Sequence, residues 1–185
     1  KIDQTPIDQL NLKDLRTAIG YVPQEAFLFS DSIKENIKFG NNQASDEEVI
    51  QAAKNAVVHK NIIDFSKGYD TILGERGITL SGGQKQRVSI ARAIIKDPQI
   101  LLFDDSLSAV DTETEEEILA NLKRIAANKT TILVSHRISS AKNADKIIIL
   151  EEGQIIQRGT HNELIAQPGY YQELYRKQLD EKEME

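Results

Sequence analysis

Two short apolar runs joined by a helix-forming segment most constrain the fold of this 185-residue chain. Residues 100–103 are an unbroken apolar run, which is typical of a strand covered on both faces, and residues 130–134 predict a second buried strand. The segment between them, residues 112–127, has the apolar spacing of an amphipathic helix. Strand, helix and strand in this order favour a parallel β-α-β unit, so the sequence predicts the α/β fold class.

The remaining elements follow from caps, breakers and periodicity. We expect a short strand at residues 19–22, which Pro23 ends. Apolar runs at residues 147–150 and 154–157 flank Glu152-Gly153, which predicts a hairpin that gives the sheet a mixed edge. The expected helices and helical turns cover residues 11–17, 31–39, 45–57, 61–65, 84–95, 138–142, 163–166 and 170–182, and a loop is expected at 68–77.

Composition argues against several classes of protein. Lys and Arg number 23 and Asp and Glu number 29, so the net charge is −6 and we expect no nucleic-acid partner. The chain has no cysteine, which excludes disulfides and thiolate metal sites. Its longest apolar runs fall far short of the ~20 residues that a bilayer-spanning helix needs.

The segment Leu80-Ser81-Gly82-Gly83-Gln84 stands directly before a predicted helix. Two adjacent glycines let backbone N–H groups approach a ligand closely, and a helix N-terminus carries a partial positive charge that suits phosphate. Ser81 can cap the helix and also offer its hydroxyl to an anion. The plainer interpretation is a cap followed by a turn, but Lys85-Gln86-Arg87 after the five residues favours a functional one.

Asp104 and Asp105 follow the first apolar strand, and His136 follows the second. The carboxyl ends of parallel strands are where α/β sheets bind ligands. One aspartate there can hold Mg²⁺ through water, a second carboxylate can orient or deprotonate a water, and an imidazole can contact a terminal phosphate. The alternatives are that the two acids are merely solvated and that the histidine is structural. The functional interpretation is favoured because all three residues follow the ends of strands.

These segments resemble the ATPases of the ABC family, and the resemblance covers nearly the whole chain. The matching motifs, in chain order, are the Q-loop Tyr21–Gln24, the exporter-type loop Gly74–Gly77, the signature Leu80–Gln84, the Walker B strand Ile100–Asp105, the D-loop Ser108–Asp111 and the switch histidine His136. Their order and spacing make the resemblance specific.

The resemblance implies a P-loop NTPase-like ABC ATPase domain, here incomplete, with a mixed or parallel sheet. Within it, a helical signature subdomain is expected at about residues 25–97. The catalytic α/β core is expected at residues 1–24 and 98–160, and C-terminal helices at residues 161–185.

The resemblance also implies ATP and Mg²⁺ as ligands and a role for each matching residue. Nucleotide binding is implied for Ser81, Gly82, Gly83, Gln84, Ser108 and Asp111. Metal binding is implied for Asp104 and Gln24, catalysis for Asp105, His136 and Gln24, and contact with the membrane domain for Gln24, Glu75 and Arg76. The implied partners are a second nucleotide-binding domain and the transmembrane domains of an exporter, at the cytoplasmic face of the cell membrane.

The family's phosphate-gripping P-loop needs Gly-Lys-Ser/Thr, and none of the ten glycines here is followed by lysine. In the family this loop lies upstream of the Q-loop. We therefore expect the chain to be the C-terminal part of the domain and inactive as an ATPase by itself. We also expect an exposed apolar face where the missing elements would pack.

Asp105 departs from the family consensus, which is glutamate. Aspartate carries its carboxylate about 1.5 Å less far, and misplacement on that scale can lower a rate by ~100-fold. The resemblance thus implies an ATP-driven export motor that is the degenerate-site subunit of a heterodimer, with Leu80–Gln84 completing the partner's site. The alternatives are a homodimer with a slow aspartate, a nucleotide-gated module without effective hydrolysis, and a soluble ABC ATPase acting on DNA or ribosomes. The exporter-type loop and the net charge argue against the last of these.

Overall fold

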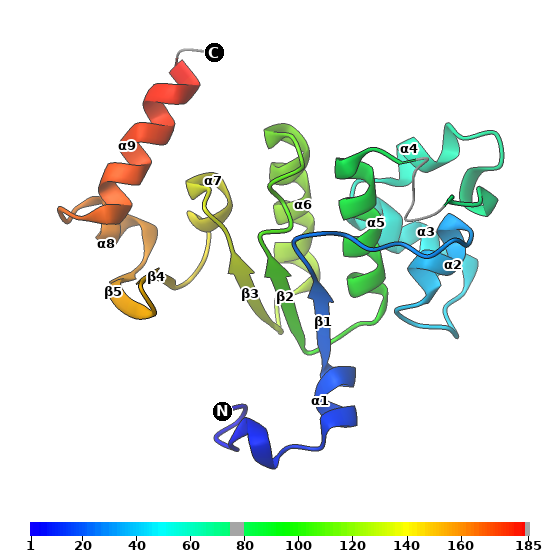
Figure 1. The fold of residues 1–185 in the computed structure, drawn as a ribbon, viewed down its shortest axis with the longest axis horizontal. Coiled ribbons are helices and arrows are strands. Elements are labelled where there is room, and N and C mark those ends of the chain that lie inside the picture. Colours follow the sequence, from blue (N-terminus) through cyan, green and yellow to red (C-terminus); the bar gives the residue numbers. More distant parts are fainter. Residues whose placement is uncertain (75–79, 184–185) are drawn as a thin grey trace. The chain divides into compact units, whose positions relative to one another are not determined.

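The computed structural model of the chain describes residues 1–74 and 80–183 (Figure 1). It contains two compact units, Lys1–Val134 and Ser135–Glu185, which are described separately. Among the described residues, no helix is both long enough and apolar enough to cross a membrane.

The first unit is built on a parallel sheet of three strands in the order β1-β2-β3, which confirms the predicted α/β class. The strands are β1 (Ile19–Val22), β2 (Ile100–Asp104) and β3 (Thr130–Val134). In their register Tyr21 pairs with Leu102, and Leu102 pairs with Ile132. Because the strands are parallel, their carboxyl ends meet at one edge of the sheet.

The helices of this unit match the predicted pattern with shifted ends. They are α1 (Leu12–Ala18), α2 (Ile33–Lys38), α3 (Asp46–Asn55), α4 (His59–Ile63), α5 (Gly82–Ile95) and α6 (Thr112–Ile125), with 3₁₀ turns η1 (Ile7–Gln9) and η2 (Gly68–Asp70). The helix α2 begins two residues later than expected because the Ser32 hydroxyl caps it, accepting from the backbone N–H of Glu35. The expected loop at 68–77 starts with η2, so that expectation was wrong for residues 68–70.

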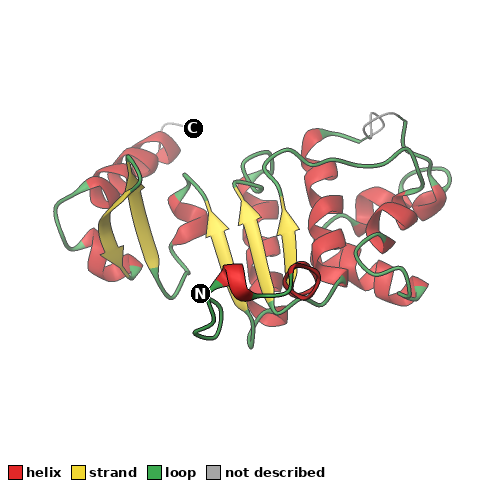
Figure 2. Cartoon of the chain, turned by 60° about the horizontal axis from the view of Figure 1, so that its bottom comes forward, coloured by secondary structure: helices red, strands yellow, loops and turns green. Residues whose placement is uncertain are grey.

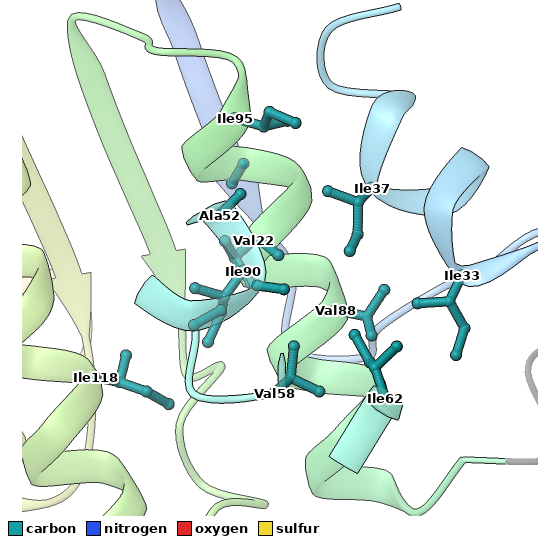
Figure 3. Close-up of a cluster of buried hydrophobic side chains, with 14 of the residues drawn as sticks. Val22, Ile33, Ile37, Ala52, Val58, Ile62, Val88, Ile90, Ile95 and Ile118 are labelled. Atoms are coloured by element: carbon teal, nitrogen blue, oxygen red, sulfur yellow. The ribbon is translucent and has the colours of Figure 1, made fainter. Parts of the chain in front are cut away.

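The core of the first unit surrounds α5, which packs against α2, α3 and β1. Figure 3 shows Ile62 of α4 pointing toward Val88 of α5, with Ile33 and Ile37 of α2 beside them. Buried side chains at three- and four-residue spacing place one face of α2, α3, α5 and α6 in this cluster, whereas α1 has no buried residue. The same cluster includes Val22 and Phe103 of the sheet, so the strands and the helical segment share one core.

One face of the sheet stays open, and the prediction that β3 is buried was wrong. The side chains that point into the core are Val22, Leu101 and Phe103. On the other face Tyr21, Ile132 and Val134 are 50%, 48% and 49% exposed, because the helices lie behind the strands (Figure 2). An apolar run predicts a strand correctly, but its burial depends on a second covering layer.

The second unit joins a hairpin to three helices. Its elements are α7 (Ile138–Ala141), β4 (Ile147–Glu151), β5 (Gln154–Gly159), α8 (His161–Ile165) and α9 (Tyr170–Glu183). A small core of Ile138, Ile147, Leu164 and Tyr171 holds them together. The predicted hairpin is confirmed, and β4 and β5 pair as an antiparallel sheet of two strands among the described residues.

Two neighbouring residues of α4 provide a test of this core. Ile62 is fully buried, whereas Ile63 is 56% exposed. We expect Ile62→Ala to lower the free energy of unfolding by about 2–5 kcal/mol, since it removes buried methyl groups and leaves a cavity. Ile63→Ala should change it by less than ~0.5 kcal/mol. Equal effects of the two variants in chemical denaturation of the 185-residue chain would contradict this packing.

Candidate functional site

The two acidic residues at the end of β2 each accept a hydrogen bond from the end of β1. The Tyr21 hydroxyl donates to Oδ2 of Asp104 at 3.0 Å, and Nε2 of Gln24 donates to Oδ2 of Asp105 at 3.2 Å. The carboxylate raises the pKa of Tyr21 above its usual value, chiefly through this hydrogen bond. Parallel pairing of β1 with β2 therefore brings together three residues that the sequence predicts as a site, Gln24, Asp104 and Asp105, and adds Tyr21.

The backbone at Asp105 turns sharply after the strand. Asp105 has a φ of 45°, in the left-handed region that few residues other than glycine adopt, and its N–H donates to the carbonyl of Val134 at 3.0 Å. The Ser108 hydroxyl donates to the Asp105 carbonyl at 2.8 Å. Ser108, which the sequence predicts as a nucleotide contact, thus stabilises the turn that carries Asp105.

The helix α5 begins at Gly82, two residues earlier than predicted, because Ser81 closes a capping box with Gln84. The Ser81 hydroxyl accepts from the N–H of Gln84 at 3.3 Å, and the N–H of Ser81 donates to Oε1 of Gln84 at 3.0 Å. The predicted cap at Ser81 is confirmed, and the exposed start of a 14-residue helix carries the partial positive charge that suits an anion.

The two glycines of this segment have different surroundings. A Cβ added at Gly83 would stand 3.0 Å from the carbonyl oxygen of Ala109, whereas one added at Gly82 would meet nothing within 4 Å. Gly83 therefore allows α5 to approach the loop after β2 closely, and Gly82 leaves its backbone open to an approaching ligand.

A buried glutamine connects the start of α5 with the end of β1. Nε2 of Gln86 donates to the carbonyl of Pro23 at 2.8 Å, and the Gln86 side chain lies in the interior. The acceptor immediately precedes Gln24 in the chain. Sequence reasoning missed Gln86 and Tyr21, since both contacts depend on the packing of segments more than 60 residues apart.

Three exposed aromatic residues form a cluster around Arg92. Phe29 packs against Phe27 and Phe39 with ring centroids 5.1 and 4.7 Å apart, and the guanidinium of Arg92 lies 5.5 Å from the Phe29 centroid. Arg92 also donates to the carbonyls of Phe27 and Asn36, both at 2.8 Å. Burial lowers the pKa of Arg92 to about 10, so its guanidinium stays charged at neutral pH.

The other residues that the sequence predicts as site residues are Asp111, His136, Glu75 and Arg76. Asp111 caps α6 by accepting from the N–H of Thr114 at 2.9 Å, and this bond lowers the pKa of its carboxyl below the usual value. His136 is exposed and belongs to the second unit, where Nε2 of Gln178 donates to its carbonyl at 2.9 Å. Glu75 and Arg76 lie outside the described residues.

The residues at the strand ends fit Mg²⁺ that is partly bound by water and phosphate better than they fit a metal bound only by protein side chains. Within residues 1–74 and 80–183 there is no group of three or more His, Cys, Asp or Glu side chains placed to hold a metal. Asp104 with Gln24 offers oxygen ligands of the kind that Mg²⁺ takes when it is bound by one carboxylate, waters and substrate phosphates.

The contrast between the glycines predicts different effects on stability. Gly83→Ala should lower the free energy of unfolding by about 1–3 kcal/mol, because its methyl group meets the Ala109 carbonyl. Gly82→Ala should leave it unchanged or raise it by up to ~1 kcal/mol, since alanine is the better helix former. Denaturant unfolding of both variants measures the difference, and a Gly83→Ala chain as stable as Gly82→Ala would contradict the close approach.

Comparison with known proteins places this geometry in a family. The family model described as ABC transporter matches residues 1–108. The chain is 53% identical over 174 residues to the uncharacterized ABC transporter ATP-binding protein YknU of Bacillus subtilis, covering 94% of this chain and 30% of that protein. It is 50% identical to ATP-binding cassette sub-family B member 6 of Xenopus tropicalis, covering 96% of this chain and 21% of that protein.

A solved structure of an ABC exporter is also similar to this chain. A bacterial Atm1-family ABC exporter with ATP bound matches with a TM-score of 0.90 and 44% identity, over 94% of this chain and 30% of that one. The chain therefore spans between about a fifth and a third of the length of these proteins. The matched family model and the shared fold together show that the chain belongs to the ABC transporter family.

Proposed function

We propose that this chain is the motor part of an ABC exporter, in which ATP binding and hydrolysis drive transport through attached membrane domains. The observation that carries the proposal is the meeting of Gln24, Asp104 and Asp105 at one edge of a parallel sheet, with hydrogen bonds from β1 to both acids. The similarity to the Atm1-family exporter supports this function, and the ATP bound in that structure supports the choice of nucleotide.

Each residue at the strand ends has a distinct chemical task in this proposal. Bound MgATP would supply the phosphoryl group, and the metal would neutralise the charge that develops on it. Asp104 would hold the metal through its carboxylate, and the amide oxygen of Gln24 would be a second ligand. Asp105 orients a water and accepts its proton, and the imidazole of His136 donates to the terminal phosphate.

The start of α5 acts on the nucleotide that is bound by a partner nucleotide-binding domain. The open Gly82 backbone, the Ser81 hydroxyl and the positive helix end are donors for phosphate oxygens presented from outside this chain. Gln84, Ser108 and Asp111 border the same contact with the partner's nucleotide. When the two domains close on each other, both nucleotide sites are completed. ATP thereby holds the pair together, and hydrolysis releases it.

Coupling to the membrane domain uses the aromatic cluster of Phe27, Phe29 and Phe39. These rings expose apolar surface, and the guanidinium of the half-buried Arg92 lies 5.5 and 5.7 Å from the centroids of Phe29 and Phe39. A short apolar helix of the membrane domain is the partner that such a surface fits. The resemblance assigns Gln24, Glu75 and Arg76 to the same coupling role, and the proposed location is the cytoplasmic face of the membrane.

Asp105 makes this chain the degenerate-site subunit of a heterodimer. Its shorter side chain slows hydrolysis at its own site, while its Leu80–Gln84 segment completes the active site of a consensus partner. The alternative function is a nucleotide-gated module that closes without hydrolysing, and Asp105 is the observation that favours it.

Three variants of the full-length heterodimer separate these possibilities. We expect Asp105→Glu to raise ATPase turnover, since the added methylene carries the carboxylate ~1.5 Å further toward the water. Asp105→Asn should change turnover by less than ~2-fold, because the partner's site does most of the hydrolysis. Gly82→Ala should lower turnover by ~100-fold, since its methyl group displaces the partner site's phosphate.

Other results would overturn parts of this assignment. A large loss of turnover in Asp105→Asn would show that the aspartate hydrolyses ATP, as in a homodimer. No change in Asp105→Glu would remove the case for degeneracy. Full turnover in Gly82→Ala would contradict the role of α5 at the partner's site.

The 185-residue chain itself should bind ATP negligibly, since none of its glycines precedes a lysine and a P-loop is absent from its sequence. Isothermal calorimetry with MgATP and the purified chain measures this directly. A micromolar affinity for MgATP would mean that the strand-end residues and α5 bind phosphate without that loop.

A further inference from the structure

We infer that Tyr21 is a positioning residue for the metal site, because its hydroxyl fixes the carboxylate of Asp104 in the orientation that receives Mg²⁺. The inference rests on the proposed function and gives Tyr21, the first residue of the motif Tyr21–Gln24, a role that the resemblance does not assign. Tyr21 acts through Asp104 and does not touch nucleotide or metal itself.

The register of the sheet places the two side chains within reach. Tyr21 pairs with Leu102, and Asp104 follows two residues later on the same face of β2. A long aromatic side chain can reach a diagonal neighbour on the same face of the adjacent strand. The Tyr21 hydroxyl ends 3.0 Å from Oδ2 of Asp104, within the range of an ordinary hydrogen bond.

The hydrogen bond restricts the carboxylate without occupying it. An aspartate at the end of a strand has several staggered χ1 rotamers, and a donor fixed to the neighbouring strand selects one of them. The bond uses Oδ2, so Oδ1 stays available as a ligand. Outer-shell donors that orient a metal ligand typically change metal affinity by ~10–100-fold when they are removed.

Gln24 and Tyr21 divide the task between them. Tyr21 donates from β1 and Gln24 donates from the segment just after it, each to one of the two adjacent carboxylates. The amide of Gln24 is a ligand that can leave Asp105 for the metal. The ring of Tyr21 belongs to the strand and stays with Asp104 when Gln24 moves.

The test compares Tyr21→Phe with Tyr170→Phe in the full-length heterodimer. Both tyrosines are half exposed, 50% and 51%, and phenylalanine keeps the ring while removing only the hydroxyl. Mn²⁺ is titrated in the presence of a non-hydrolysable ATP analogue and followed by electron paramagnetic resonance of the free ion. Binding of the analogue without metal is measured in parallel.

We expect Tyr21→Phe to weaken Mn²⁺ binding at this chain's site by ~10-fold, with metal-free nucleotide affinity unchanged. Tyr170→Phe should match the unsubstituted protein in both measurements. Mn²⁺ affinity in Tyr21→Phe that is unchanged or tighter would overturn the role of Tyr21, as would an equal loss of metal-free nucleotide binding. If the unsubstituted protein binds no Mn²⁺ with the analogue, the proposed function itself fails and this inference fails with it.

Discussion

The parallel pairing of β1 with β2 is the interaction on which the rest of the structure depends. It joins segments about 80 residues apart, and it alone places the residues after Val22 beside those after Phe103. A shift of the register by one residue would turn Tyr21 into the core and leave Asp104 without its donor. The core on one face of the sheet prevents that shift, because Val22, Leu101 and Phe103 are all buried there.

Much of this arrangement could be predicted from the sequence, because the signals for it lie between residues that are close together in the chain. The apolar runs at 100–103 and 130–134 predict strands, and the capping boxes at Ser45 and Ser81 are set by residues three positions apart. The Asp-Asp pair after a strand likewise predicts a site at its carboxyl end. Each of these features is determined by neighbours in the chain.

What could not be predicted depends on distant segments. The hydrogen bonds of Tyr21 and Gln86 depend on a register and a packing angle that no local pattern contains. The exposure of Ile132 and Val134 depends on which layers cover the sheet, and apolar character alone does not determine it. The left-handed backbone of Asp105 is also invisible in composition, although aspartate adopts it more readily than most residues.

Under the proposed function, the bond from Gln86 to the Pro23 carbonyl would connect two nucleotide sites. In that proposal α5 serves the partner's nucleotide and the end of β1 serves this chain's own, so one buried amide would join the two binding equilibria. Thermodynamic linkage then requires the influence to be mutual: whatever free energy one site gains from the other's occupancy, the other gains in return. An ATP held for a long time at one site would thus act on its neighbour as an allosteric effector.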